Sequence, residues 1–527
     1  MQDKKTLSSS QPARKSLANR TQERWILVAT IVGSSMVFID ANVVNVALPQ
    51  IQLELNVNAS GVQWVVEAYS LFLASLMLVG GSLGDRYGLK RIFAIGIALF
   101  AAASLWSGLA LDGTQLIIAR ATQGIGGALL TPGSLAIIRA TFSAARRGHA
   151  IGLWSGFSAI TSALGPLLGG WLVQHVSWRW VFFINVPLAL LALAVLCIPL
   201  RGLSMVSEGR SSTHLDWPGA LFATLGLGGL VFGLVESNTF GLNNLLVLLS
   251  MGGGMLALIG FVFVELRSAS PMMPLKLFRS PTFGGTNLLT LFLYAALSGT
   301  FFFLPFVLIQ AQGYSATAAG ASLLPFTLLM FSLSRWAGGL INRFGAKLPL
   351  VVGPVVAAAG FALFALPGVG GSYWTTYFPA VTVLGLGMTI TVAPLTTAVL
   401  GAVADRYAGI ASAINNAVSR LSGLLAIAVL SIFVLRVFDS DLTGRLSSLP
   451  VSPSLRQAML AQGNKLASVQ IPPAVSGSLR HTLAYAVAAS FISGFRVAML
   501  ICCGLALLAA LSSFLFVKGR SLDSHRL

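Results

Sequence analysis

Charged residues are scarce in this chain: Asp, Glu, Lys and Arg make up only 9% of its 527 residues. A soluble protein carries about 25% of them. Together with 56% hydrophobic residues and a mean hydropathy of +0.84, this scarcity excludes a soluble domain and predicts an all-α integral membrane protein. The formal net charge is +18, but the basic residues lie between apolar runs, which indicates membrane topology and not nucleic-acid binding.

Cysteine and catalytic motifs are also scarce. Cys197, Cys502 and Cys503 lie within or beside apolar runs, so they predict neither a disulfide framework nor a metal site. The chain has no Gly-x-x-x-x-Gly-Lys-Ser/Thr loop, which argues against direct drive by ATP, and no His-Glu-x-x-His motif. The sequence therefore predicts neither an enzyme nor a cofactor-dependent protein.

Long apolar stretches are abundant, and fourteen of them approach the ~20 residues that a membrane-spanning helix needs. The run after the basic tail is too long for a signal peptide, so we expect a retained first span. An even number of spans puts both termini on one side, and the Lys and Arg residues of the connections predict that this side is cytoplasmic. The predicted spans are 25–47, 62–82, 92–110, 115–138, 150–172, 180–199, 217–235, 246–265, 285–310, 318–340, 348–367, 375–398, 408–436 and 488–517.

A charged turn at 81–91 recurs 257 residues later, so that Gly88 corresponds to Gly345 and Asp85 to Asn342. Two copies in the same apolar setting predict a duplicated protein with two matching halves. The predicted domains are a cytoplasmic basic tail at 1–24, an N-terminal six-span bundle at 25–200, a linker with two extra spans at 201–284, a C-terminal six-span bundle at 285–517, a long outer loop within it at 437–487, and a cytoplasmic tail at 518–527.

Three charged residues, Asp40, Glu67 and Arg120, lie inside predicted spans of the first half. Each costs at least ~2.5–3.5 kcal/mol if ionised at mid-bilayer, so each needs a reason. Counted at about 1.5 Å per residue, all three reach one level in the outer half of the membrane. They therefore suit a proton and cation site. The alternative is a buried salt bridge that holds helices together, and for Glu67 also solvation near the headgroups.

The second half has no acid inside its predicted spans. Asn415, Asn416 and Arg420 form a polar stretch of span thirteen, which is either a polar substrate wall or a set of interhelical hydrogen bonds. Span five is dense in small residues, which favours either close helix packing or a hinge. Its key residues are Gly152, Gly165, Pro166, Gly169 and Gly170.

Five stretches in order carry a family resemblance, at 38–49, 81–91, 120–126, 152–170 and 178–187. They are similar to motifs of the major facilitator superfamily and, within it, of the 14-span drug:H+ antiporters of the EmrB/QacA type. The sequence departs from that pattern at Asn42, where Thr is commoner, and at Thr161, where Gly is usual.

The resemblance implies a major facilitator fold, with two six-helix bundles, two inserted helices and alternating access between the bundles. It makes Asp40 and Arg120 coupling or substrate residues, with Asn45 and Gln123 in the same motifs. The 81–91 turn becomes a latch that closes against the start of span thirteen, near Arg406 and Gly409. The latch residues are Gly81, Asp85, Arg86, Gly88, Lys90 and Arg91.

We therefore expect proton-coupled export of amphipathic small molecules such as drugs. The proton gradient supplies the energy, with no cofactor. The lack of acids in the later spans favours a neutral, monocationic or anionic lipophile over a dication. The expected partners are protons and the lipid bilayer, with no nucleic acid. The expected location is the cell (inner) membrane, as a monomer, and related members also work with an accessory periplasmic protein. The alternatives are a dedicated exporter of one lipid, siderophore or metabolite and, more remotely, a receptor or transferase.

Overall fold

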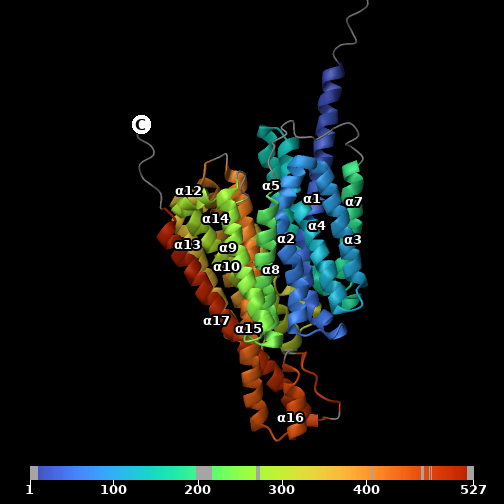
Figure 1. Cartoon of the computed structure of the whole chain (residues 1–527), viewed down its shortest axis with the longest axis vertical. Coiled ribbons are helices and arrows are strands. Elements are labelled where there is room, and N and C mark those ends of the chain that lie inside the picture. The colour runs from blue at the N-terminus through green and yellow to red at the C-terminus, as the bar shows by residue number, and fades with distance from the viewer. Residues whose placement is uncertain are drawn as a thin grey trace, which may run out of the picture.

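The computed structural model describes residues 10–197, 216–268, 273–404, 407–463, 468–473, 475 and 477–518. Figure 1 shows a long bundle of helices, with the start of α1 and the end of α17 at the same end. The helices are α1 (Ser10–Glu54), α2 (Ala59–Tyr87), α3 (Leu89–Leu109), α4 (Gly113–Thr141), α5 (Ala144–His175), α6 (Trp180–Phe183), α7 (Asn185–Cys197), α8 (Trp217–Phe240), α9 (Leu245–Arg267), η1 (Leu275–Arg279), α10 (Pro281–Phe306), η2 (Val307–Ala311), α11 (Ala316–Ala321), α12 (Leu324–Phe344), α13 (Lys347–Phe364), α14 (Tyr373–Gly401), α15 (Ala408–Ser448), α16 (Pro453–Leu460) and α17 (Gly477–Phe516).

A helix lies at each of the fourteen predicted spans. By length and composition, however, only eleven described helices qualify as membrane crossings, or twelve if α2, bent by 51° beside Met77, counts as one. The remaining two are α4, whose 29 residues include Arg120 and Arg139, and α7, which has 13 described residues. A multi-pass protein is therefore established, and the count of fourteen stays a prediction.

Polar side chains begin several of these helices. Asn58 accepts a hydrogen bond from the backbone N–H of Gly61 at the start of α2, and Asp112 accepts one from Gln115 at the start of α4. Asp216 does the same for Gly219 of α8. Each cap satisfies a backbone donor that the first helical turn leaves unpaired. Short polar breaks thus separate the apolar runs into distinct helices.

The helices associate in two groups. In the first, α2 and α3 pack on α4, while α1 packs on α5 and α7. In the second, α10 and α13 pack on α17, and α12 and α13 pack on α14. These are the blue-to-teal and the yellow-to-red parts of Figure 1. The α8–α9 hairpin lies between them in sequence and contacts both α2 and α15. The predicted 201–215 and 519–527 segments, like residues 1–9, lie outside the described residues.

The two copies of the repeated turn have the same local structure. Gly88 ends α2 with φ 99°, and Gly345 ends α12 with φ 73°, a region that side chains other than glycine rarely adopt. The guanidinium of Arg86 lies 5.4 Å from the Tyr87 ring centroid, and that of Arg343 lies 5.3 Å from the Phe344 ring centroid. The duplication read from the sequence is therefore also present in the geometry of the chain.

The 437–487 connection contains more helix than its polar sequence indicates. α15 continues to Ser448, and α17 begins at Gly477, so both helices extend into the predicted loop. The short helix expected near 454–469 is present as α16, Pro453–Leu460. Phe438, Leu442 and Met459 are buried there and belong to the same apolar cluster as the helices of the bundle, so the segment continues that core. Figure 1 shows it projecting from the end of the bundle opposite to the described chain ends.

The two groups of helices meet at this same end, which we call the closed end. Gln310 donates a hydrogen bond of 3.3 Å to Gln52 of α1 and one of 2.6 Å to Ser468. The backbone N–H of Thr317, in α11, donates to Gln174 of α5 at 3.1 Å. The opposite end, which carries the 81–91 turn, is called the loop end. These polar contacts between the first and second groups lie at the closed end.

Candidate functional site

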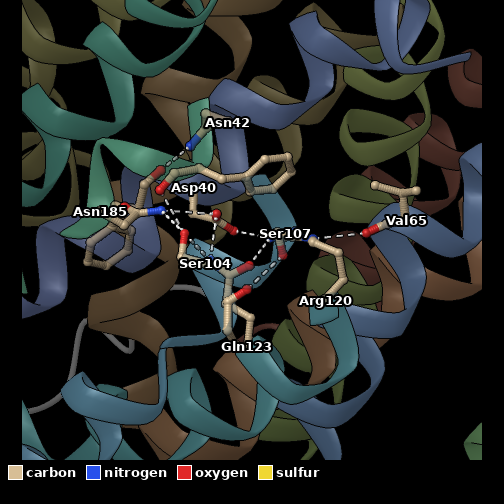
Figure 2. A network of polar contacts seen from close by, with 11 residues as sticks. Asp40, Asn42, Val65, Ser104, Ser107, Arg120, Gln123 and Asn185 are labelled. Carbon is tan, nitrogen blue, oxygen red and sulfur yellow. Dashed lines mark hydrogen bonds and ion pairs between the residues drawn. The ribbon is translucent and has the colours of Figure 1, made fainter. Parts of the chain in front are cut away.

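A buried ion pair joins α1 and α4 inside the first group of helices (Figure 2). Arg120 Nη1 lies 2.6 Å from Asp40 Oδ2, and the two side chains are 2% and 0% exposed. Arg120 Nε donates to the backbone carbonyl of Val65 on α2 at 3.0 Å. The pair thus ties three helices together at one point.

Amide side chains complete this network. Gln123 Nε2 donates to Asp40 Oδ1 at 2.8 Å, and Asn185 Nδ2 reaches the same oxygen at 3.4 Å. Asn185 also donates to Ser104 Oγ at 3.0 Å. With Arg120, three donors from α4 and α7 face the Asp40 carboxylate. A buried carboxylate surrounded by donors is stabilised in its ionised form.

The Arg120 guanidinium also lies against an aromatic ring, 4.2 Å from the centroid of Tyr69. A cation over a desolvated ring gains about 2 kcal/mol. Tyr69 is close enough to Asp40, and to Arg420 of α15, for electrostatic interaction with both. Tyr69 therefore lies beside the buried pair, on α2.

The environment of Glu67 differs from the predicted one, in which Glu67, Asp40 and Arg120 form a single site. Glu67 is fully buried on α2, and neither of its carboxyl oxygens has a hydrogen-bond partner among the described residues. The predicted approach of Glu67 to Asp40 and Arg120 produces no hydrogen bond or ion pair among the described residues, since α2 presents the Val65 carbonyl to Arg120 instead. Burying an unpartnered carboxylate is very costly, so the neutral acid is the form that this environment favours.

A cavity of about 510 Å³ lies between the two groups of helices. One wall, from α1 and α5, is polar and includes Asn42, Asn45 and Ser162, with Asn42 Nδ2 donating to Ser162 Oγ at 3.0 Å. The amide of Asn45 has no hydrogen-bond partner in the described part of the chain, so it is free to bind a ligand. The facing wall, from α10, α12 and α14, is mainly apolar and is lined by Phe301, Pro305, Leu323, Phe326, Thr327, Met330, Phe331, Ser334 and Val392.

The polar stretch of α15 lies outside the described lining of that cavity. Asn415 Nδ2 donates to Thr290 Oγ1 at 2.7 Å and to Asn287 Oδ1 at 3.2 Å, both on α10. These are interhelical hydrogen bonds of the kind that the sequence left open. Asn416 donates to a carbonyl of its own helix, and Arg420 interacts electrostatically with Tyr69. A substrate wall at Asn415, Asn416 and Arg420 stays a prediction.

The 81–91 turn lies at the loop end, far along α2 from the ion pair. Asp85 and Arg86 are exposed, and no described residue forms an ion pair with either. Arg406, one expected latch partner, lies outside the described residues, and Gly409 lies beside Arg139 of α4. The latch of Gly81, Asp85, Arg86, Gly88, Lys90 and Arg91 therefore stays a prediction.

The small residues of α5 fall into two kinds. A Cβ at Gly165 or Gly169 would meet Asn42 or Val43 of α1 at less than contact distance, and a Cβ at Gly170 would clash with the Ala316 carbonyl. Close packing across and within the groups thus requires these three glycines, and Pro166 lies against Gly320 of α11. By contrast, a Cβ at Gly152 would meet nothing within 4 Å. The hinge assignment stays a prediction.

Sequence reasoning did not single out Ser104, Asn185 or Tyr69. Ser104 and Ser107 are the two hydroxyl residues of the apolar helix α3, and Asn185 begins the short α7. An uncompensated polar group inside a membrane helix is a signal for an interhelical partner. That signal was available for Ser104 and Asn185, but it could not identify Asp40 as the partner of Asn185.

The sequence model of the Major Facilitator Superfamily matches residues 30–427. The tetracenomycin C resistance and export protein of Streptomyces glaucescens is 34% identical over 498 residues, 92% of this chain and 90% of that protein. The multidrug resistance protein Stp of Mycobacterium tuberculosis is 31% identical over 491 residues, again 92% of this chain and 90% of that protein.

Solved structures show the same fold at lower sequence identity. A bacterial homologue of the human lysosomal transporter Spinster, in an inward-facing and occupied conformation, has a TM-score of 0.62 and 17% identity, covering 93% of this chain and 96% of that one. An auto-inhibited peptide transporter of the POT family has a TM-score of 0.62 and 15% identity, covering 96% and 99% of the two chains.

Proposed function

The chain belongs to the major facilitator superfamily, and we propose that it exports amphipathic small molecules in exchange for protons. Relatives that align over nine-tenths of the chain are named for antibiotic export and multidrug resistance. The cavity between the two groups of helices supports a transporter, since its polar and apolar walls suit a molecule with both kinds of surface.

The observation that carries proton coupling is the contrast between two buried acids. Asp40 faces three donors, whereas Glu67 has none among the residues that the structure describes. We assign the transported proton to Glu67 in this conformation, because its buried carboxyl has no partner among the described residues, whereas the donors around Asp40 are in place. Rearrangement of the helices around Glu67 gives its carboxyl access to water and releases the proton. Protonation of Asp40 frees Arg120, which weakens the link between α1, α2 and α4.

The conformational cycle alternates the end at which the cavity opens. At the closed end, Gln310 and Gln52 link the two groups of helices, and α11 packs on α5. Substrate enters while these contacts hold and leaves when they separate. We assign the closed end to the outer side of the cell membrane, with both chain termini cytoplasmic, in accord with the basic connections.

The substrate in this proposal is a lipophile that is neutral, monocationic or anionic. The described cavity lining contains no acid that would bind a dication. The protein acts as a monomer without a cofactor and uses the proton gradient as its energy source. An accessory periplasmic protein is an optional partner in this proposal.

The test uses purified protein in proteoliposomes with an imposed pH gradient. Addition of an exported drug should dissipate the gradient in a protein-dependent manner, and a panel of unrelated drugs should include several active compounds. Asp40→Asn and Glu67→Gln should each abolish this coupled proton movement. A wild-type protein that moves drug at the same rate with and without the gradient would disprove antiport, and one active compound alone would indicate a dedicated exporter.

A further inference from the structure

The two groups of helices face each other along two seams, and the two seams differ in how they are packed. One seam runs between α2 and α15, and we call it the sealed seam. The other runs between α5 and α12, and we call it the open seam. The cavity lining includes residues of α5 and α12 but none of α2 or α15 among the described residues.

The inserted helix α8 covers the sealed seam. Leu71 of α2, Val231 of α8 and Leu424 of α15 belong to one buried apolar cluster. Two polar contacts reinforce it: Trp64 Nε1 donates to Glu236 at 2.9 Å, and Ser60 Oγ donates to the Val235 carbonyl at 3.2 Å. In Figure 1 α8 lies between α2 and the second group of helices. A molecule in the bilayer cannot pass through packed side chains of this kind.

The open seam is closed only towards the closed end. There α11 packs on α5, where a Cβ at Gly320 would clash with the Pro166 carbonyl. Towards the loop end, a Cβ at Gly152 or Gly156 of α5 would meet nothing within 4 Å, and the same holds for Gly338 and Gly339 of α12. Space for a side chain therefore exists on both helices of the open seam.

The surface of the open seam suits a lipophilic molecule. Phe157 on α5 and Phe331 on α12 are 48% and 54% exposed. The hydroxyl groups nearby are satisfied within their own helices, since Thr161 donates to the Phe157 carbonyl and Ser334 to the Phe331 carbonyl. A path whose described hydroxyl groups are paired in this way presents little cost to an apolar molecule that leaves lipid. Phe331 also lines the cavity, so the seam leads directly into it.

We propose that uncharged lipophilic substrates enter the cavity sideways from the bilayer leaflet at the loop end, through the open seam between α5 and α12. The inserted α8 seals the opposite seam and makes this route one-sided. Gly156 and Gly338 form its two edges, since Gly338 follows Ser334 by one helical turn on the same face of α12. This inference rests on the proposed export function.

The experiment measures export of two uncharged fluorophores that differ only in an alkyl chain, which keeps one in the bilayer and leaves the other in water. The variants are Gly338→Trp and Gly339→Trp, each of which places a large ring in described open space on α12, outside the described cavity lining. Gly252→Trp on α9 is the matched control, because its Cβ also meets nothing within 4 Å and it lies away from both seams. Each protein is reconstituted in the same lipid at the same density.

We expect each seam variant to slow export of the alkylated fluorophore about tenfold, equivalent to about 1.4 kcal/mol of added barrier, and to leave the water-soluble fluorophore close to wild type. The control should export both normally. Equal losses for the two fluorophores, or no loss for the alkylated one, would overturn entry through the open seam. If the wild-type protein exports neither fluorophore nor any drug of the panel, the export function itself fails.

Discussion

Arg120 and Asp40 form a 2.6 Å ion pair whose side chains are at most 2% exposed. Removing one partner of such a pair leaves an uncompensated buried charge, which costs about 3–5 kcal/mol. Arg120→Gln should therefore lower the thermal unfolding midpoint of the purified protein strongly. Adding Asp40→Asn to it should restore most of that stability, because the unpaired charge is gone, but should not restore proton-coupled transport.

The matched control for this prediction is Arg445→Gln. Arg445 forms an i,i+4 pair with Asp441 on α15, and these side chains are 39% and 32% exposed. An exposed pair contributes only about 0–1 kcal/mol. If Arg120→Gln unfolds at the same temperature as Arg445→Gln, the buried pair does not hold α1, α2 and α4 together.

Asn45 should contribute to substrate binding through its unpartnered amide. Loss of one neutral hydrogen bond costs about 0.5–1.5 kcal/mol, so Asn45→Ala should weaken the affinity for a hydrogen-bonding drug several-fold in an equilibrium binding assay. Ser250→Ala on α9 is the control, because that hydroxyl bonds only within its own helix. An unchanged affinity in Asn45→Ala would remove this residue from the substrate site.

We expect position 88 to require glycine because of its backbone conformation. Its φ of 99° strains any residue with a Cβ, so Gly88→Ala should destabilise the protein, by an amount exceeding the ~0.4–1 kcal/mol that alanine gains at a compatible site. Gly345→Ala, at the repeated position, should behave in the same way. Gly253→Ala in the middle of α9 should be neutral or stabilising. Thermal unfolding of the three variants side by side tests whether the two turns are equivalent.

Asp85 should control the conformational balance and not the substrate site. It is exposed near the end of α2, about 45 residues along the chain from Asp40, and its counterpart in the second half is Asn342. Asp85→Asn should change the rate at which a cysteine placed at Thr317 is labelled from the closed end, in a background without native cysteines. Its drug affinity should stay close to wild type, and a large loss of affinity would place the turn in the binding site.

Much of the architecture could be predicted because runs of apolar residues mark the predicted membrane-spanning segments. A helix of the structure lies at each predicted apolar run, and the two copies of the turn indicated the duplication. The Asp40, Arg120 and Gln123 motifs pointed to residues that the structure brings into one network. The extent of α15 and α17 beyond the predicted spans was not predictable in this way, because α15 packs there on α16 and on α17, and hydropathy does not encode such contacts.

The site depends on helix rotation, which one-dimensional patterns determine poorly. Asp40 and Asn45 lie on the same helix, yet Asp40 faces the interior of the first group and Asn45 faces the cavity. Likewise, depth alone placed Glu67 at the level of Arg120, but α2 presents the Val65 carbonyl to that arginine. Equal depth in a membrane does not imply contact.

The sequence by itself determined the membrane class, the positions of the helices, the duplicated halves and the family, because these follow from composition, hydropathy and motifs that need no neighbour. Only the tertiary structure decided which side chains meet: the three donors around Asp40, the absence of a partner for Glu67, the cavity walls, and the sealing of one seam by α8. Those features depend on how the helices are rotated and packed against one another, which is a property of the whole assembly and not of any single segment.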